Sequence, residues 1–435
     1  MSVSSRRADL VAAAAATALV ALATGVGFAL HVRLAGSAHF PGAPNTFGEW
    51  PVLAELLPHV GPGTPIAILV AVAAVAWGPA LAARLPWRTA LGAAYLLAVV
   101  WTFALAMVDG WQRGVAGQLT SQDEYLTAVP GITDIPAMLH SFSDRILDFQ
   151  PDSWITHVAG HPPGATLVFV WLDRIGLGGG GWAAVVCVLV GGLVAVAVPH
   201  TLAVLGAPDR ARAALPFVAL FPGAVWMGVS ADALFAGVTA SGIALLAVGA
   251  ARGRAVWSAA AGVLLGFGIF LSYGLPLMGF VAIGVLVAAR TWRPLLWAVP
   301  AALAVVGVFA LAGFWWLDGY HLVVERYYQG IATDRPYWYW VWADLAALVL
   351  AIGPAAVAGL RRAFVARGPA VVLGAAVAVL AATLSGLSKA EVERIWLPFA
   401  VWLVAAAALL PAPRRWLAAQ AVTALLVNHV LLTNW

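Results

Sequence analysis

Long apolar segments separated by short polar turns recur along nearly the whole chain. Runs of about 17–22 residues are the length at which an α-helix crosses about 30 Å of hydrocarbon. Barrel strands would instead alternate over about ten residues, and a lipid-exposed helix satisfies its own backbone hydrogen bonds. The pattern predicts about thirteen transmembrane helices, at roughly 10–30, 65–83, 89–108, 182–205, 213–229, 233–250, 255–271, 275–289, 295–316, 339–360, 369–386, 395–411 and 416–433.

The segment 163–178 is apolar but short, and Asp173 and Arg174 lie near its end. A complete crossing here would reverse the orientation of every later turn, so we predict a re-entrant or half-inserted segment buried in protein. Longer polar segments are expected at 31–64, 109–162 and 317–338. In the second of these, apolar residues recur at helical spacing between Pro136 and Leu147, which predicts an amphipathic surface helix.

The two sets of loops that alternate along this topology differ in charge. Arginines occupy one set of short turns, and most acidic residues fall in the other set. Short arginine-rich loops remain in the cytoplasm. We therefore expect a multi-pass protein of the plasma membrane with a cytoplasmic N-terminus and any chemistry on the extracytoplasmic face. The arginines concerned are Arg6, Arg7, Arg84, Arg88, Arg210, Arg212, Arg252, Arg254, Arg290, Arg293, Arg361, Arg362, Arg367, Arg414 and Arg415.

The composition is typical of a membrane protein and limits which cofactors the chain can bind. The chain is 63% hydrophobic and 10% charged, whereas soluble domains are about 45–50% apolar and about 25% charged. The net charge of +4 resides in the short turns and predicts topology, not binding to nucleic acid. The single cysteine, Cys187, excludes a disulfide framework and a thiolate metal site. Since no phosphate-binding or dinucleotide motif is present, we expect no nucleotide cofactor.

The richest cluster of reactive side chains lies in the segment 109–162. Asp123 and Glu124 are adjacent and point in different directions, so one can serve as a base while the other binds a metal or a hydroxyl. His157 and His161 would share a face of a helix, but Pro162 disfavours helical backbone at His161. The pair Pro162–Pro163 can begin a helix. Glu124, His157 and His161 are candidate metal ligands, and the alternative is a loop of solvated acids.

Asp232 lies between two apolar segments, where an ionisable residue suggests function. Alternatively, Asp232 or Ser230 only caps the following helix. Further along, Trp338, Tyr339 and Trp340 are typical of a membrane-interface belt.

Two later segments combine cations with aromatic or acidic residues. Arg326, Tyr327 and Tyr328 are expected on the acidic side, where an arginine and aromatic rings suit a phosphate and a sugar. Charged residues also crowd a short turn between two apolar segments, which suggests a cationic pair that binds phosphate or, alternatively, a self-paired cap. These residues are Lys389, Glu391, Glu393 and Arg394.

The order of these motifs resembles the GT-C glycosyltransferases. Over residues 89–250 the chain is similar to the protein O-mannosyltransferase and aminoarabinose-transferase group: a crossing that ends near Met107, then Asp123-Glu124-Tyr125, a surface helix, His161-Pro162-Pro163 and Asp232. Its Arg326-Tyr327-Tyr328 and 391–396 segments look like those of actinobacterial membrane mannosyltransferases. The resemblance implies a GT-C type bundle, with an N-terminal transmembrane pair and outer loop at 1–88 and a catalytic region at 89–435 of one membrane domain.

The resemblance further implies a polyprenyl-phosphate sugar donor, inversion at the anomeric carbon and a cell-envelope glycan, lipid or protein as acceptor. Mannose is the expected sugar, and arabinose competes with it. Asp123 matches the family's catalytic acid position, with Asp109 as its rival. Glu124 and His161 match positions that face the donor phosphate or a metal, and Asp232 matches an acid that lines the same cavity. His161 replaces the usual lysine, so a divalent metal remains an open requirement.

The chemistry of the residues agrees with that activity. An inverting transfer needs one carboxylate base and cations that hold the leaving phosphate, and it needs no second carboxylate nucleophile. A donor on a lipid carrier also accounts for the absence of a nucleotide motif. The main alternative is a transporter or flippase of lipid-linked sugars, although transporters place polar residues near mid-membrane. A non-catalytic scaffold of the cell envelope is the third reading.

Overall fold

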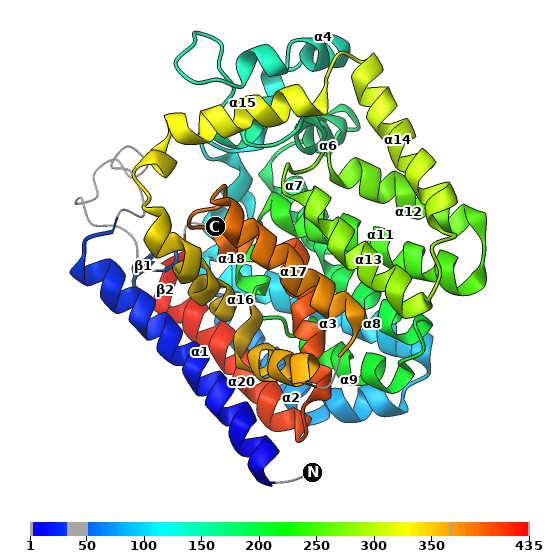
Figure 1. Ribbon diagram of the computed structural model, residues 1–435. Coiled ribbons are helices and arrows are strands. Elements are labelled where there is room, and N and C mark those ends of the chain that lie inside the picture. Colours follow the sequence, from blue (N-terminus) through cyan, green and yellow to red (C-terminus); the bar gives the residue numbers. More distant parts are fainter. Residues whose placement is uncertain (1–2, 33–50, 366–367, 434–435) are drawn as a thin grey trace.

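The computed structural model describes residues 3–32, 51–365 and 368–433, apart from the side chains of 3 and 4. Most of the predicted outer loop 31–64, namely 33–50, and Arg367 lie outside the described residues. The chain forms a bundle of helices in which α1 runs diagonally along one side and α15 lies across the top (Figure 1).

Six helical segments of the described chain are long and apolar enough to cross a membrane: Ser5–Ala29, Thr64–Arg84, Trp87–Asp109, Gly180–Val204, Ala231–Arg252 and Tyr337–Val365. The prediction of an all-α polytopic membrane protein is confirmed. Helices α12, α13, α17 and α19 are apolar but shorter. The helices have the bounds α1 Val3–Ala29, α2 Thr64–Arg84, α3 Trp87–Ala106, α7 Gly180–Gly192, α8 Val194–Val204, α11 Ala231–Arg252, α12 Ala255–Gly268, α13 Met278–Ala289, α16 Tyr337–Val365, α17 Ala370–Ser385, α18 Val392–Ile395, α19 Leu397–Val404 and α20 Pro413–Val430.

Two predicted crossings are broken in the structure. The segment 213–229 comprises the end of α9 (Pro208–Ala219) and the short α10 (Ala224–Met227), because Pro222-Gly223 interrupts the helical backbone hydrogen bonds. The predicted 295–316 is α14 (Leu295–Leu311), which meets α15 (Trp316–Gln329) at 73°. Helix α15 therefore occupies most of the polar segment that the sequence placed between two crossings.

The segment 163–178 does not cross the bundle. It forms α6 (Pro163–Arg174), whose length is about 18 Å at 1.5 Å per residue. Just before its first residue, the ring of His161 lies 5.7 Å from that of Tyr125. At its end, Arg174 donates hydrogen bonds to the carbonyls of Ile132 and Thr133. Both ends of α6 thus contact the loop 107–162, and the re-entrant or half-inserted path of this segment stays a prediction.

The predicted surface helix is shorter than its apolar spacing suggested. Helix α4 covers Ile135–His140, with Asp134 accepting a hydrogen bond of 2.9 Å from the amide of Ala137 at its start. A 3₁₀ turn, Ser143–Arg145, follows it. The apolar positions are nevertheless buried as expected, including Phe142 and Ile146. Helical spacing therefore identified the packed face, although the α-helix ends after six residues.

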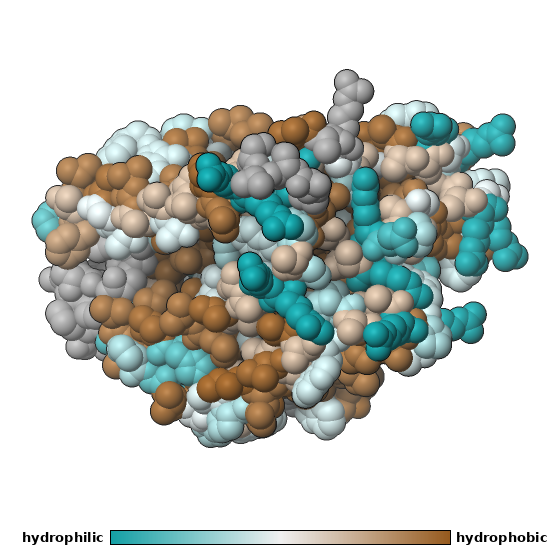
Figure 2. All heavy atoms as spheres, turned by 90° about the horizontal axis from the view of Figure 1, so that it is seen from below, coloured by the Kyte–Doolittle hydropathy of each residue, from teal (hydrophilic) through white to brown (hydrophobic). Residues whose placement is uncertain are grey.

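Contacts between distant loops define two ends of the bundle. At the arginine-rich end, Asp9 near the start of α1 pairs with Arg361 and Arg362 near the end of α16, and Arg212 donates to carbonyls in the α2–α3 turn. Figure 2 views the molecule from below and shows hydrophilic side chains gathered toward the right of that face. The opposite end, here called the site end, carries the loop 107–162, α15 and the turn 386–396. The arginine-rich turns that these contacts join and the acid-bearing loop 107–162 therefore lie at opposite ends of the fold.

The first and last parts of the chain meet at the site end. Strand β1 (Ala54–Leu56) pairs antiparallel with β2 (Leu431–Thr433), with Glu55 opposite Leu432. Helix α1 packs along α16, where the Tyr339 hydroxyl donates to the carbonyl of Ala23. Trp338 is exposed, but Tyr339 and Trp340 are fully buried. The belt interpretation is therefore wrong for the latter two, because α1 covers them.

Candidate functional site

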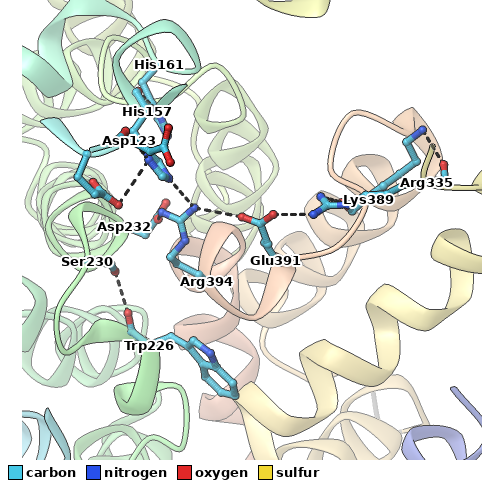
Figure 3. A network of polar contacts seen from close by, with 11 residues as sticks. Asp123, His157, His161, Trp226, Ser230, Asp232, Arg335, Lys389, Glu391 and Arg394 are labelled. Atoms are coloured by element: carbon cyan, nitrogen blue, oxygen red, sulfur yellow. Dashed lines mark hydrogen bonds and ion pairs between the residues drawn. The ribbon is translucent and has the colours of Figure 1, made fainter. Parts of the chain in front are cut away.

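A row of polar and charged side chains runs through the site end (Figure 3). It begins at Asp123, whose backbone carbonyl accepts hydrogen bonds from both the amide of His157, at 3.0 Å, and its Nδ1, at 2.8 Å. His157 lies in the single helical turn α5 (Thr156–Ala159), and His161 follows outside that turn, as Pro162 predicts. Since a carbonyl only accepts, Nδ1 of His157 carries a proton.

The second nitrogen of His157 is also engaged. Its Nε2 lies 3.3 Å from Nη2 of Arg394, and a guanidinium only donates. His157 is therefore a neutral imidazole with its proton on Nδ1. His161 donates from Nδ1 to the carbonyl of His157 at 2.8 Å. Burial is the main cause that lowers the pKa of His161 to about 3, so this ring is neutral.

These bonds bear on the predicted metal ligands Glu124, His157 and His161. Glu124 Oε1 lies 3.5 Å from Nδ1 of His157, but both nitrogens of that ring already have protein partners. Within the described part of the chain, no group of three or more histidine, cysteine or acidic side chains is placed to hold a metal. The three predicted ligands are neighbours without forming a coordination set.

Arg394 occupies the middle of the row and is almost fully buried. Its Nη1 donates to Oδ2 of Asp232 at 2.9 Å, and its Nη2 lies 3.7 Å from Oε2 of Glu391. Burial alone would lower the pKa of Arg394, but Asp232 and Glu391 outweigh it, and the pKa is raised. The capping interpretation of this region is wrong, because Ser230 donates to the carbonyl of Trp226 and Asp232 pairs with Arg394.

The row continues to a basic end. Arg335 donates from Nη2 to Oε1 of Glu391 at 2.9 Å and from Nη1 to the carbonyl of Lys389 at 2.7 Å. Burial raises the pKa of Glu391 on its own, but Arg335 and then Arg394 bring it below its ordinary value. The ammonium of Lys389 donates to the carbonyls of Ala332 and Arg335. Its pKa is lowered by burial and by Arg335.

The turn that carries these residues is strained. Ala390 and Glu391 both have left-handed backbone, with φ of 68° and 62°. A non-glycine residue in this region costs of order 1–3 kcal/mol and persists only where surrounding contacts impose it. One such contact is the hydrogen bond of 3.1 Å from the amide of Ala390 to Oδ1 of the buried Asp344. In this strained turn the carboxylate of Glu391 lies between the guanidinium groups of Arg335 and Arg394.

The predicted aromatic and cationic residues of α15 divide between two environments. The hydroxyl of Tyr327 accepts a hydrogen bond of 2.8 Å from the amide of Lys389, and Nζ of Lys389 lies 5.2 Å from the ring of Tyr328. Both tyrosines therefore belong to the basic end of the row. Arg326 instead pairs with Asp148 at 2.9 Å and donates to the carbonyl of Trp154. It fixes the 109–162 loop to α15.

The acidic residues of the site also differ in their partners. Asp123 is partly exposed and accepts a hydrogen bond of 2.9 Å from the hydroxyl of Thr156. Glu124 is buried, and its Oε2 has no hydrogen-bond partner among the described residues. Glu393 is completely buried. Burial, and then Glu391, raise its pKa to about 7, although backbone amides of Glu393 itself and Leu53 counteract part of the shift.

The rival base Asp109 belongs to a separate cluster. Its Oδ1 lies 2.7 Å from Nε2 of His59, and its Oδ2 lies 3.7 Å from Nε of Arg113. Arg113 also donates to the carbonyl of Thr433, beside the small sheet. Asp109 is therefore engaged by a histidine and an arginine where the first and last segments of the chain meet.

Sequence reasoning missed three residues of this site. Arg335 lies in the segment 317–338 among the acidic residues, where an arginine departs from the charge bias and was a usable signal. Asp344 lies within an apolar crossing, where an ionisable residue is expensive and suggests function. Thr156 gave no signal, because one hydroxyl in a loop is unremarkable until the fold brings it to Asp123.

Among known proteins, no family model and no curated protein matches the chain. The fold is similar to two crystal structures of ArnT from Cupriavidus metallidurans. The apo structure has a TM-score of 0.46 and 18% sequence identity, and the structure bound to undecaprenyl phosphate has a TM-score of 0.45 and 19% identity. Each alignment covers 72% of this chain, and the chain spans a little under three fifths of the solved protein, 58% and 59%. The case for a function therefore rests on the row of charged side chains itself.

Proposed function

We propose that this chain is an integral membrane glycosyltransferase that moves one sugar from a polyprenyl-phosphate donor to a cell-envelope acceptor with inversion. One observation supports this above all: negative and positive charges lie at different ends of the row (Figure 3). Carboxylates of Asp123 and Glu124 lie at one end, and the cations of Arg335 and Lys389 lie at the other. Arg394, held by Asp232 and Glu391, connects the two ends.

An inverting displacement needs a base on one side of the anomeric carbon and a cation for the leaving phosphate on the other. The acceptor oxygen attacks the anomeric carbon from one side while the phosphate departs from the other. The hydroxyl proton passes to a carboxylate, and the breaking bond leaves its electron pair on the phosphate oxygen, where cations stabilise the developing charge. We assign Asp123 as the base. Its carboxylate is partly exposed, Thr156 orients it, and no cation lies within 4 Å of it among the described side chains.

We assign the leaving phosphate to Lys389 and Arg335 in place of Arg394. Asp232 and Glu391 both lie within 4 Å of Arg394, so two carboxylates already offset its charge, although Arg335 shares Glu391. Lys389 instead donates to neutral carbonyls, which leaves its positive charge uncompensated. Arg394 then acts as a positioning residue that holds Asp232 and His157, while Tyr327 and Tyr328 offer the basic end aromatic surface for a sugar or lipid.

The remaining parts of the proposal follow from topology and the family resemblance. The donor tail lies among the helices, and the site end faces the extracytoplasmic side, with the N-terminus in the cytoplasm. Mannose is the first sugar to test and arabinose the second. No step is assigned to a divalent ion.

The experiment is transfer from radiolabelled polyprenyl-phosphate mannose or arabinose by the full chain in liposomes. Asp123→Asn should abolish transfer, because an amide cannot take the proton. Asp144→Asn is the matched control, since Asp144 is an exposed acid of the same loop. Transfer that survives Asp123→Asn refutes the base assignment, and no transfer by the wild type with any donor and acceptor offered argues against the function.

Transport of lipid-linked sugars remains the second candidate, because two buried segments are broken. The backbone of α16 is non-helical at Gly353, with φ of 75°, and Pro222 of the α9–α10 break lies beside that glycine. Interrupted helices are common in transporters. Movement of a fluorescent lipid-linked sugar across liposomes that persists in Asp123→Asn, without any transfer by the wild type, would favour this alternative.

A further inference from the structure

Helices α2 and α20 lie side by side, yet their two ends are joined differently. At the site end, Nε2 of His429 lies 3.0 Å from the hydroxyl of Thr64, and the amide of His59 donates to the carbonyl of His429 at 2.8 Å. Asn428 adds a hydrogen bond to the carbonyl of Leu105. These polar contacts close the helix pair at the site end.

At the arginine-rich end the same two helices separate. A crevice of about 350 Å³ opens between them, and its walls are almost entirely apolar. Packing contact resumes next to it, where Gly78 approaches Leu417 and Pro216. The crevice is lined by Pro79, Ala80, Ala412, Pro413, Arg414 and Arg415.

The two arginines of the crevice have no acidic partner. Arg414 and Arg415 are exposed, and neither forms an ion pair with any side chain that the structure describes. At the same end, by contrast, Arg361 and Arg362 both bind Asp9. Helix α2 is itself peripheral, with Leu69, Val72 and other large apolar side chains exposed along it. Two arginines without an acidic partner among the described residues therefore border the apolar crevice on the outer surface of the bundle.

We propose that this crevice binds an anionic phospholipid, with the lipid phosphate on Arg414 and Arg415 and an acyl chain along Pro79 and Ala80. Charge complementarity selects an anionic headgroup, and basic pockets between transmembrane helices suit such lipids. The apolar walls select an amphiphile over a free anion, because a small hydrated ion gains nothing from apolar surface. The bound lipid fills the end of the α2–α20 pair that lacks hydrogen bonds. This site is independent of the glycosyltransferase proposal.

The test measures binding of phosphatidylglycerol and phosphatidylcholine to the purified full-length protein by native mass spectrometry, with inorganic phosphate as a third probe. Two arginines near an anionic headgroup, at about 1 kcal/mol each, predict roughly thirtyfold tighter binding of phosphatidylglycerol. Arg414→Gln/Arg415→Gln should remove that preference. Arg252→Gln/Arg254→Gln, which neutralises another exposed arginine pair at the turn between α11 and α12, should retain it.

A second variant separates the crevice from its charges. Ala80→Trp fills the gap and keeps both arginines, so it should weaken phosphatidylglycerol binding while phosphate binding stays as weak as in the wild type. Equal binding of the two lipids overturns the proposal. So does full preference in Arg414→Gln/Arg415→Gln, or competition by inorganic phosphate at the lipid concentration.

Discussion

Two clusters of the site end contain the same three residue types and use them differently. In the first, Asp109 meets His59 and Arg113. In the second, Asp123 and Glu124 adjoin His157, which adjoins Arg394. His59 directs Nδ1 to the carbonyl of Leu57 and Nε2 to the Asp109 carboxylate. His157 gives one nitrogen to a backbone carbonyl and the other to a guanidinium.

The two clusters therefore differ in the partners of their carboxylates. One oxygen of the Asp109 carboxylate contacts His59 and the other contacts Arg113, so its negative charge is compensated. In the second cluster Arg394 pairs with Asp232 and Glu391, and the two ring nitrogens of His157 contact Asp123 and Arg394. Asp123 has no cation within 4 Å among the described side chains, which suits the base role proposed for it. The partners of each carboxylate, more than its position in the sequence, distinguish the two.

The largest expected effect is on the rate of sugar transfer, when Asp123 and Asp109 are each replaced by asparagine. Asp123→Asn should lower the rate of sugar transfer by about 10²–10⁴-fold, the usual contribution of a general base. Asp109→Asn should leave the rate within a small factor of the wild type, because its cluster lies outside the row. Rates are measured with saturating polyprenyl-phosphate donor. The reverse outcome, a dead Asp109→Asn and an active Asp123→Asn, would make Asp109 the base.

The arginines of the clusters should differ in their contribution to stability. Arg394→Met leaves Asp232 buried without its cation, which costs about 3–5 kcal/mol. Arg113→Met breaks a half-exposed contact and should cost at most about 1 kcal/mol. Unfolding of the detergent-solubilised protein measures both. The double variant Asp232→Asn/Arg394→Met should recover part of the loss, and no recovery would mean that Arg394 stabilises the fold by packing alone.

The buried carboxyl group of Glu393 predicts that the stability of the folded protein depends on pH. Its pKa is about 7 in the folded protein and ordinarily 4.5. Between these values the folded state keeps a proton that the unfolded state has lost, so stability falls as pH rises through this window and then levels off. The loss is about 3 kcal/mol at most. Glu393→Gln should flatten this profile of unfolding against pH. An unchanged profile would assign the dependence to another group.

The smallest effect is expected at the first cluster. His59→Gln removes the ring that joins Asp109 to the carbonyl of Leu57, and a hydrogen bond to a charged group contributes about 1.5 kcal/mol. Stability should fall by that amount while the transfer rate is retained. A loss of transfer in properly folded His59→Gln would show that the two clusters act together.

Local pattern predicted several features of the site correctly. Pro162 placed His161 outside a helix, and apolar spacing identified the buried face near Phe142. Pattern could not predict that Arg394 would pair with Asp232, 162 residues away in the sequence. The phosphate role first expected for Arg394 therefore passed to Lys389 and Arg335 in our proposal.

The sequence by itself determined that this is a helical membrane protein with its charges divided between two ends, because hydrophobic length and arginine placement act locally along the chain. Tertiary structure decided which carboxylate keeps its charge uncompensated. In a buried environment that property depends on which distant cation reaches each acid, since an ion pair forms across space and leaves no periodic trace in the sequence.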